Sequence, residues 1–263
     1  MLAALHQRRP HIHCITNYVT AEACANLLHA CGALPIMADA PEESAEITEN
    51  ACALDINLGT LSTARAAAML ASGRTANRIG IPAVLDPVGV GATAFRRETA
   101  SALLREIRFA AIKGNASEIR YLAGISAECS SADVSDADSA DAVHSADAAK
   151  RLAQKTGAVI LLTGETDLVT DGIRMFRIRN GHPMMSRITG SGCMLSALTA
   201  AFLAVRPEDP LTACVTAACA MGLAGEIALP SDGNMTFRNA LIDAVFRMTE
   251  QQLEEGARYE AEC

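Results

Sequence analysis

A loop of small residues that leads into a long apolar segment is the part of the sequence best suited to chemistry. Residues 188–195 are ITGSGCML, and an apolar helical pattern follows them. Glycines let the backbone approach a ligand closely, and the first N–H groups of a helix have no partner within it. The positive end of the helix dipole lies at the same point. This loop therefore predicts an anion-binding site.

Cys193 lies at the start of the predicted helix, beside Gly190 and Gly192. A thiol at a helix N-terminus has a lowered pKa, so a thiolate could act there as a base at neutral pH. A base beside an anion hole is the arrangement needed to phosphorylate an alcohol. A buried cysteine that only packs the helix start is the alternative, and the flanking glycines favour the catalytic interpretation.

A second group of polar residues, KGNASE, occupies positions 113–118 at the end of an apolar run. Asn115 as N-cap and Glu118 three residues later predict a capping box, which explains both without any ligand. It does not explain Lys113. A cation beside a carboxylate at the end of a strand suits a nucleotide phosphate with Mg²⁺, so this segment is predicted to bind both.

The segment DPVGVGA begins at Asp86, again at the end of an apolar run. Gly89, Gly91 and Ala94 match the spacing of a dinucleotide-binding loop, but a lone match is weak and Pro87 separates strand from glycines. We interpret Asp86 as a carboxylate near the metal, and nicotinamide binding is the weaker alternative.

Short apolar runs alternate with Ala-rich helical patterns, and these elements must position the polar groups. The runs are HIHCITN, ALPIMA, DINLG, PAVLD, FAAIKGN and AVILLTG, with helical patterns over 19–31, 44–51, 62–78 and 95–107 and from Asn115 onward. Such alternation predicts an α/β fold with three layers, in which helices cover both faces of a mostly parallel sheet. The strands then end at one rim, where Thr163 adds a hydroxyl, although a turn explains that residue equally well.

After AVILLTG the pattern changes. Residues 167–169 and 173–178, separated by Asp171-Gly172, predict an antiparallel hairpin at one edge, with 184–187 as a possible third member. Nearly all of the chain from Ser191 onward has helical character. Residues 126–148 are rich in Ser, Ala and Asp, and we expect a solvated loop there that leads into a helix ending near Gln154. No linker divides the chain, so residues 1–263 are predicted to form a single domain.

Composition excludes several classes of protein. Half of the residues are hydrophobic but only 3% are aromatic, which argues against a base-stacking module. The net charge of -8 and the lack of a basic stripe argue against nucleic acid as a partner. The nine cysteines form an odd number without a CxxC pair, as is typical of reduced thiols in a cytoplasmic protein. We expect neither a secretory segment nor membrane association.

Seven segments in register resemble the hydroxyethylthiazole kinase family of thiamine biosynthesis, within the ribokinase-like superfamily. They are CITNYV, ALPIMADAPEE, LDINLGTLS, VLDPVGVGA, IKGNASEI, LLTGETDLVTDG and ITGSGCMLSAL. The resemblance implies phosphorylation of a hydroxyethylthiazole by ATP with Mg²⁺. It also implies a ribokinase-like fold and a homotrimer whose thiazole sites lie between subunits.

The resemblance also assigns roles to individual residues. Cys193 stands where ribokinase-like relatives carry a catalytic Asp. The thiazole contacts are Met37, Gly190 and, nearby, Asn17; the ATP contacts are Lys113 and Thr163, to which we add Asn115 and Gly192; the carboxylates that orient Mg²⁺ are Asp86 and Glu118. Many family members have Arg where this chain has Lys113, and Lys keeps the charge without the bidentate fork. Without the resemblance, Met37 is nearly as well explained as a core residue.

Three other functions stay open. Another ribokinase-like enzyme, such as a hydroxymethylpyrimidine kinase or a hydratase, would have a similar sheet and anion hole but usually Asp in place of Cys193. A thiol hydrolase would use Cys193 as nucleophile with a histidine, and His11 and His13 are near a predicted strand. A nucleotide sensor would bind ATP without turnover.

Overall fold

The computed structural model describes residues 1–125 and 134–262, and for 134–142 it describes only the helix that contains them. The strands are β1 (His11–Ile15), β2 (Leu34–Ile36), β3 (Ala53–Asn57), β4 (Ala83–Asp86), β5 (Ala111–Asn115), β6 (Val159–Thr163), β7 (Asp167–Thr170), β8 (Met175–Ile178) and β9 (Tyr259–Glu262). The helices are α1 (Leu2–Arg8), α2 (Ala21–Ala30), α3 (Ser44–Glu49), α4 (Thr63–Ile79), α5 (Ala94–Glu106), α6 (Ala116–Ala123), α7 (Val134–Thr156), α8 (Ser191–Val205), α9 (Pro210–Ile227), α10 (Asn234–Arg247) and α11 (Glu250–Gly256), with a 3₁₀ turn, η1, over Pro183–Arg187.

The nine strands of the described residues belong to one sheet, in the order β2-β1-β3-β4-β5-β6-β7-β8-β9. The pairs from β2 to β6 are parallel. The pairs from β6 to β9 are antiparallel. The predicted mostly parallel sheet with an antiparallel hairpin at one edge is therefore confirmed.

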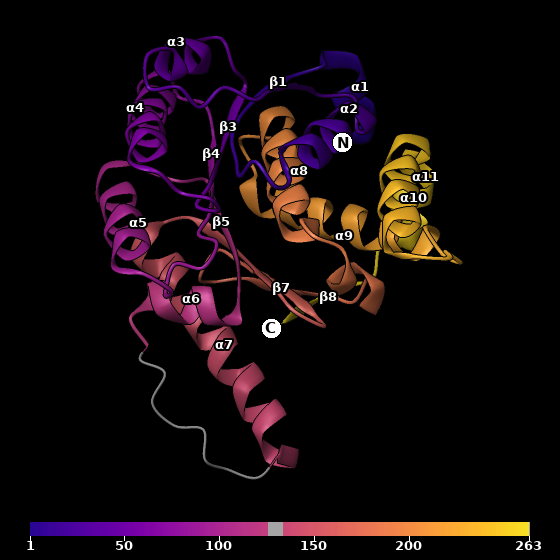
Figure 1. Cartoon of the computed structure of the whole chain (residues 1–263). Helices are drawn as coiled ribbons and strands as arrows, with labels where there is room; N and C mark the ends of the chain where they lie inside the picture. The colour runs from indigo at the N-terminus through magenta and orange to yellow at the C-terminus, as the bar shows by residue number, and fades with distance from the viewer. Residues whose placement is uncertain (126–133, 263) are drawn as a thin grey trace.

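Helices cover both faces of this sheet, as Figure 1 shows, with α4 to α7 on one side and α2, α8, α9 and α10 on the other. Successive side chains of a strand point to opposite faces, so each strand contributes to both cores. In β6, for example, Ile160 and Leu162 join the core under α4 to α7. Val159 and Leu161 join the core under α8 and α9. The three predicted layers follow from this alternation.

The antiparallel edge differs from the prediction in one strand. Residues 184–187 form part of the 3₁₀ turn η1 and not a strand. Pro183 at its start has no N–H to donate to a sheet, and the His182 side chain accepts a hydrogen bond from the Met184 N–H. The third antiparallel member is β9 at the C-terminal end, which pairs with β8. The prediction that the last third is nearly all helical missed this strand.

The loop expected within residues 126–148 can be compared with the structure only from Val134 onward. Residues 126–133 lie outside the described part of the chain, and α7 begins at Val134. The alanines that alternate with Ser and Asp from Val134 onward are strong helix formers, which explains why this polar stretch lies in a helix.

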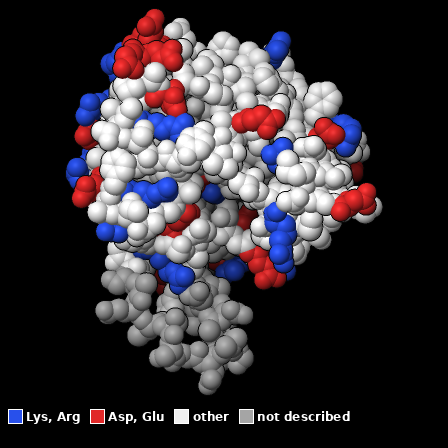
Figure 2. Space-filling view, in the orientation of Figure 1, with Lys and Arg blue, Asp and Glu red and all other residues white. Residues whose placement is uncertain are grey.

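Charged side chains are interspersed on the face drawn in Figure 2, with basic and acidic groups side by side. Among the described helices, α9 is long and apolar enough to cross a bilayer by length and composition alone. Of its apolar window, 72% is buried inside the protein. This helix is therefore a core element that packs against α8 and the sheet.

Candidate active site

Polar side chains meet at the carboxyl edge of the parallel strands. Asn17 follows β1, Asn57 ends β3, Asp86 ends β4 and Thr163 ends β6. Asn57 is level with Asp86 in the sheet, and Asn115 is level with Thr163. Helix α8 starts at this same edge, because Cys193 in its first turn contacts Asn17 and Asn57. The strand ends and the helix start thus form one candidate site.

The glycine loop approaches its neighbours closely at two positions. Gly190 is the N-cap of α8 with φ 92°, and a Cβ there would lie 2.5 Å from a side-chain carbon of Thr20. A Cβ on Gly192 would lie 2.8 Å from the ammonium nitrogen of Lys113. No side chain caps α8. Its first N–H groups are therefore available to a ligand, with a buried cation directly beneath them, as an anion site requires.

Two amide groups surround the Cys193 sulfur. Asn57 donates to Sγ from Nδ2 at 3.2 Å, and Asn17 donates from its own Nδ2 at 3.3 Å. The Cys193 side chain is only partly buried, whereas the cysteines of α2 and α9 are fully buried. The sulfur is therefore held as a hydrogen-bond acceptor at a point that a small molecule can still reach.

The expected lowering of the Cys193 pKa is wrong. Burial raises the pKa of this thiol, and the negative charge of Asp86 raises it further. Thr20, Lys113 and Asn57 act in the opposite direction but do not outweigh burial. The helix N-terminus alone was a poor guide because it ignored desolvation and the neighbouring carboxylate. In the free protein this thiol keeps its proton at neutral pH.

Lys113 and Asp86 form a buried ion pair, with Nζ 3.1 Å from Oδ1. Burial raises the pKa of Asp86 to about 6, against the opposing effect of Lys113. Burial alone lowers the pKa of Lys113, but the charges of Asp86, Glu118 and Cys193 outweigh it and raise this pKa. Lys113 therefore stays a cation beneath the glycine loop, while the Asp86 carboxyl can titrate near neutrality.

Asn115 and Glu118 form the predicted capping box at the start of α6. One oxygen of Glu118 accepts from the Asn115 N–H at 2.9 Å, and the other accepts from the Gly89 N–H at 2.9 Å. Glu118 thus ties the loop after β4 to the loop after β5. Its charge reaches Asp86, because it contributes to the raised pKa of that group.

The remaining predicted residues lie at the rim and contact the centre less directly. The Thr163 hydroxyl donates to the Gly114 carbonyl at 3.4 Å. Met37 directly follows β2 and is 37% exposed. The loop after Met37 is held over β1 because His13 hydrogen-bonds the Ala38 carbonyl at 2.7 Å. The structure gives Met37 no polar partner, and its role toward a ligand stays a prediction.

An arginine at the start of α4, which the sequence did not single out, braces this rim. Arg65 donates from Nε to Asp39 at 2.7 Å and from Nη1 to the Thr60 hydroxyl at 2.7 Å. Its guanidinium also lies 5.6 Å from the centre of the Tyr18 ring. Three loops after β1, β2 and β3 are thereby fixed together around the site.

Asn57 and Asp55 are two further polar residues that sequence reasoning missed. Both lie in β3, on the face toward α8, and both are fully buried. Asp55 accepts a short hydrogen bond from the Ser196 hydroxyl of α8. Burial raises the pKa of Asp55 to about 7. Two polar residues at alternate positions of an apolar strand were the available signal, because buried polar side chains need partners on one face.

The two predicted carboxylates can supply only part of the ligand set that Mg²⁺ needs. The described residues include no group of three or more His, Cys, Asp or Glu side chains that could hold a metal by themselves. Both oxygens of Asp86 and both of Glu118 already accept hydrogen bonds, but a carboxylate oxygen has a second lone pair. The donor set suits a cation that arrives with a nucleotide and keeps water and phosphate oxygens as ligands.

The thiol hydrolase alternative lacks its second residue. No histidine within the described residues hydrogen-bonds Cys193. His13 is buried and bonded to Thr48 and the Ala38 carbonyl, and His11 lies at the opposite end of the same strand. Neither can act as the general base that such a mechanism needs.

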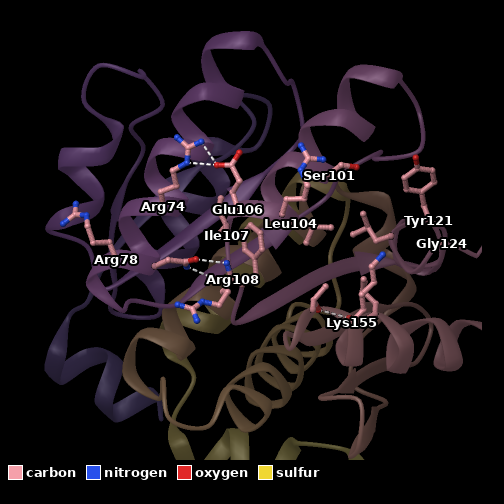
Figure 3. Close-up of a pocket in the computed structure, with 16 residues that line it drawn as sticks. Arg74, Arg78, Ser101, Leu104, Glu106, Ile107, Arg108, Tyr121, Gly124 and Lys155 are labelled. Carbon is pink, nitrogen blue, oxygen red and sulfur yellow. Dashed lines mark hydrogen bonds and ion pairs between the residues drawn. The ribbon is translucent and has the colours of Figure 1, made fainter.

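A wide cleft lies at the opposite end of the sheet. It has a volume of about 820 Å³ and a basic lining that includes Arg74, Arg78, Arg105, Arg108 and Lys155. Figure 3 shows Arg74, Arg78, Arg108 and Lys155 around the cleft, with Arg74 paired to Glu106. Helices α4, α5 and α7 end here, each with a basic residue in its last turn. Those charges complement the negative ends of the helices, so the cleft needs no ligand to explain it.

Comparison with known proteins identifies the family. The chain matches the Hydroxyethylthiazole kinase family over residues 2–251. It is 47% identical to the hydroxyethylthiazole kinase of Clostridium acetobutylicum, over 96% of this chain and 95% of that protein. The solved structure of a hydroxyethylthiazole kinase protein from Pyrococcus horikoshii OT3 superposes with a TM-score of 0.89 at 35% identity, covering 99% of this chain and 96% of that one.

More distant structures support the fold alone. A ribokinase-like superfamily protein from Enterococcus faecalis V583 superposes with a TM-score of 0.61 at 16% identity, over 93% of this chain and 94% of that one. The predicted ribokinase-like architecture is confirmed. Together with the match over residues 2–251, these likenesses show that the chain belongs to the hydroxyethylthiazole kinase family.

Proposed function

We propose that this protein transfers the γ-phosphoryl group of ATP to the hydroxyl of 4-methyl-5-(2-hydroxyethyl)thiazole, giving the thiazole monophosphate and ADP. The observation that carries the proposal is the meeting of the Cys193 sulfur, the uncapped start of α8 and the Lys113 ammonium at one point. An alcohol kinase needs such a point, since negative charge gathers on the transferred phosphoryl group.

In the proposed reaction, the hydroxyl oxygen bonds to the γ-phosphorus while the bond from that phosphorus to the β,γ-bridging oxygen breaks. The hydroxyl proton passes to Sγ of Cys193, which must first be a thiolate. Because burial and Asp86 raise the pKa of this thiol, only a minor fraction of the protein carries the Cys193 thiolate at neutral pH. A loose transition state makes late proton transfer sufficient, so the sulfur can also serve by orienting the hydroxyl.

The start of α8 and the strand ends are assigned to the phosphates. Gly192 contributes its free N–H, and Lys113 supplies positive charge beneath it. Asn115 and Thr163 are level with each other at the ends of β5 and β6, where a nucleotide could lie along the edge. Buried as it is, Lys113 acts by its charge and not as a fork around phosphate oxygens.

Asp86 and Glu118 are assigned to Mg²⁺, which would neutralise charge on the phosphates when bound. Each carboxylate is fixed by hydrogen bonds before any metal arrives: Asp86 by Asn57 and Lys113, and Glu118 by two backbone N–H groups. Such orientation of the donors is what a metal site in a kinase requires.

The thiazole is assigned to the rim near Met37, Gly190 and Asn17. Exposed apolar side chains gather on the loop after β1, where Tyr18 is 73% exposed and Val19 is 61% exposed. An apolar rim around a reacting centre suits contact with a second subunit. The homotrimer with substrate bound between subunits is proposed from the family resemblance. We assign the whole chain to a single cytoplasmic domain.

A substrate panel tests the function. The protein is incubated with ATP and Mg²⁺ and with hydroxyethylthiazole, hydroxymethylpyrimidine or no alcohol, and ADP and phosphorylated product are measured. Product only with the thiazole is the expected result, and chelation of Mg²⁺ should abolish it. If ADP is released only with the pyrimidine, the substrate is hydroxymethylpyrimidine and not the thiazole. ATP binding without turnover would indicate a nucleotide sensor. Light scattering at several concentrations tests the trimer separately.

A further inference from the structure

The Cys193 sulfur accepts from a closed network of two asparagines. Nδ2 of Asn57 lies 3.2 Å from Sγ and 2.7 Å from Oδ2 of Asp86. Nδ2 of Asn17 lies 3.3 Å from Sγ and 3.2 Å from Oδ1 of Asn57. Each NH₂ group has two protons, so each has one for the sulfur and one for an oxygen.

The orientation of both amides is determined by their neighbours. Oδ1 of Asn57 accepts from the Gly59 N–H at 2.8 Å, and Oδ1 of Asn17 accepts from the Thr20 N–H at 3.1 Å. Turning the Asn57 amide over would place its NH₂ against the Gly59 N–H and its oxygen against the Asp86 carboxylate. Both contacts would be repulsive, so only the orientation that donates to sulfur satisfies every group.

The backbone around these asparagines is shaped to hold them. A Cβ on Gly59 would lie 2.8 Å from Cβ of Asn17 and 2.9 Å from Oδ1 of Asn57. Both asparagines are buried, with 5% of Asn17 and none of Asn57 exposed. Neither side chain can turn away from Cys193 without losing partners that water cannot replace.

We propose that Asn57 is a positioning residue whose amide holds the Cys193 sulfur as a hydrogen-bond acceptor, facing the substrate hydroxyl, and ties that sulfur to Asp86. Because two N–H groups occupy one side of Sγ, its own proton, or the proton that it receives, lies on the open side. The assignment rests on the proposed part of Cys193 in the reaction. It adds a residue for which the sequence suggested no role.

The simpler explanation is a buried asparagine that only completes hydrogen bonds in the core. It predicts that losing Asn57 destabilises the fold and leaves the reactivity of the sulfur unchanged. The proposal predicts in addition a change at Cys193, because a donor to sulfur favours the thiolate. The other groups that influence this thiol are Asn17, Asp86, Lys113, Thr20 and Cys24, and all of them stay in the Asn57 variants below.

The first experiment measures Cys193 itself without any substrate. In Asn57→Leu, which keeps the shape and removes the donor, iodoacetamide labelling of Cys193 is followed against pH by peptide mass spectrometry. The midpoint should move upward by about one pH unit. Asn77→Leu is the matched control, since Asn77 is a structural asparagine bonded to the Arg108 backbone at the opposite end of the sheet. Asn57→Ser serves as a second variant if Asn57→Leu does not fold.

The second experiment is a double-mutant cycle on turnover. Asn57→Leu should lower kcat by about 10- to 100-fold in the wild-type background, the effect of a hydrogen bond to a charged group. Its effect should be clearly smaller in Cys193→Ala, because the part that passes through the sulfur is already absent there, while the bond to Asp86 is lost in both backgrounds. An unchanged labelling midpoint, or the same loss of kcat in both backgrounds, would overturn the proposal. If the protein phosphorylates no alcohol, the proposed function fails, while the labelling result still decides the role of Asn57.

Discussion

The two ends of the central sheet use charge in opposite ways. At the carboxyl edge, Lys113 and Asp86 are buried and each is bonded to a specific partner. At the opposite edge, Arg105, Arg108 and Lys155 are exposed around a wide cleft and make no ion pair within the described residues. The smaller, buried group carries the proposed chemistry, because charges withdrawn from water have perturbed pKa values and fixed positions. The wide cleft alone would have pointed to the opposite edge.

Removing the sulfur should give the largest effect at the carboxyl edge. We expect Cys193→Ala to lower kcat by about 10²- to 10⁴-fold, the usual contribution of a positioned base. Cys52→Ala is the control, because Cys52 is an exposed thiol at the start of β3. Steady-state assays with the thiazole measure both. Full turnover in Cys193→Ala would reduce the thiol to a packing residue.

Breaking the buried ion pair should be the next most severe change. Lys113→Met leaves Asp86 without its cation and should cost about 3–5 kcal/mol of folding free energy at pH 8. The loss should shrink at pH 5, since Asp86, with a pKa of about 6 even beside Lys113, then binds a proton. Urea unfolding at both pH values measures this.

The matched control for Lys113→Met lies in the cleft. Arg78→Met removes an exposed pair with Glu49 and should cost less than about 1 kcal/mol. Equal losses for Lys113→Met and Arg78→Met would erase the contrast between the two ends.

The pH dependence of turnover tests the raised thiol pKa. If thiolate is required, kcat should rise with pH toward and beyond 9, by about tenfold per unit below the thiol pKa. Cys193→Asp should be slower but flat over the same range, because its carboxylate would already be ionised. The amide donors of Asn17 and Asn57 suit either group. A flat profile for the wild-type protein would assign the sulfur to orientation alone.

Asp55 offers a stability test beneath the site. Its pKa of about 7 exceeds the ordinary value for Asp, so the folded state loses stability as pH rises from about 4 to 7. Asp55→Asn removes this penalty and should stabilise the fold at pH 8 by about 1–3 kcal/mol, after the cost of an unsatisfied amide proton. The gain should be smaller at pH 5. A destabilised Asp55→Asn at pH 8 would show that the charge itself is needed.

Much of this architecture could be predicted because periodicity and turns are local properties. The parallel strands and their helices follow from apolar runs that alternate with helical patterns, and Asp171-Gly172 predicts the turn between β7 and β8. β9 could not be predicted in the same way. Its residues, YEAE, are mostly exposed, and only pairing with the distant β8 makes them a strand.

The site residues show the same difference between features that local sequence determines and features that depend on distant contacts. Gly190, Gly192 and the capping box at Asn115 were predictable, because each depends on a short stretch of backbone. The raised pKa of Cys193 and the part of Asn57 were not. Both depend on side chains that come together only when β3 and α8 pack against each other, which a single sequence does not reveal.

The smallest effect is expected at the opposite end. Arg105→Gln and Arg108→Gln, singly or together, should change kcat and the KM for ATP by less than about twofold, because they lie away from the strand ends that carry the site. Stability should change by less than about 1 kcal/mol, since Arg105 only complements the end of α5. A tenfold rise in the KM for ATP in the double variant would show that the cleft takes part in nucleotide binding. The basic lining would then need a functional explanation, and buried charge would no longer distinguish the carboxyl edge, which carries the proposed active site, from the opposite edge.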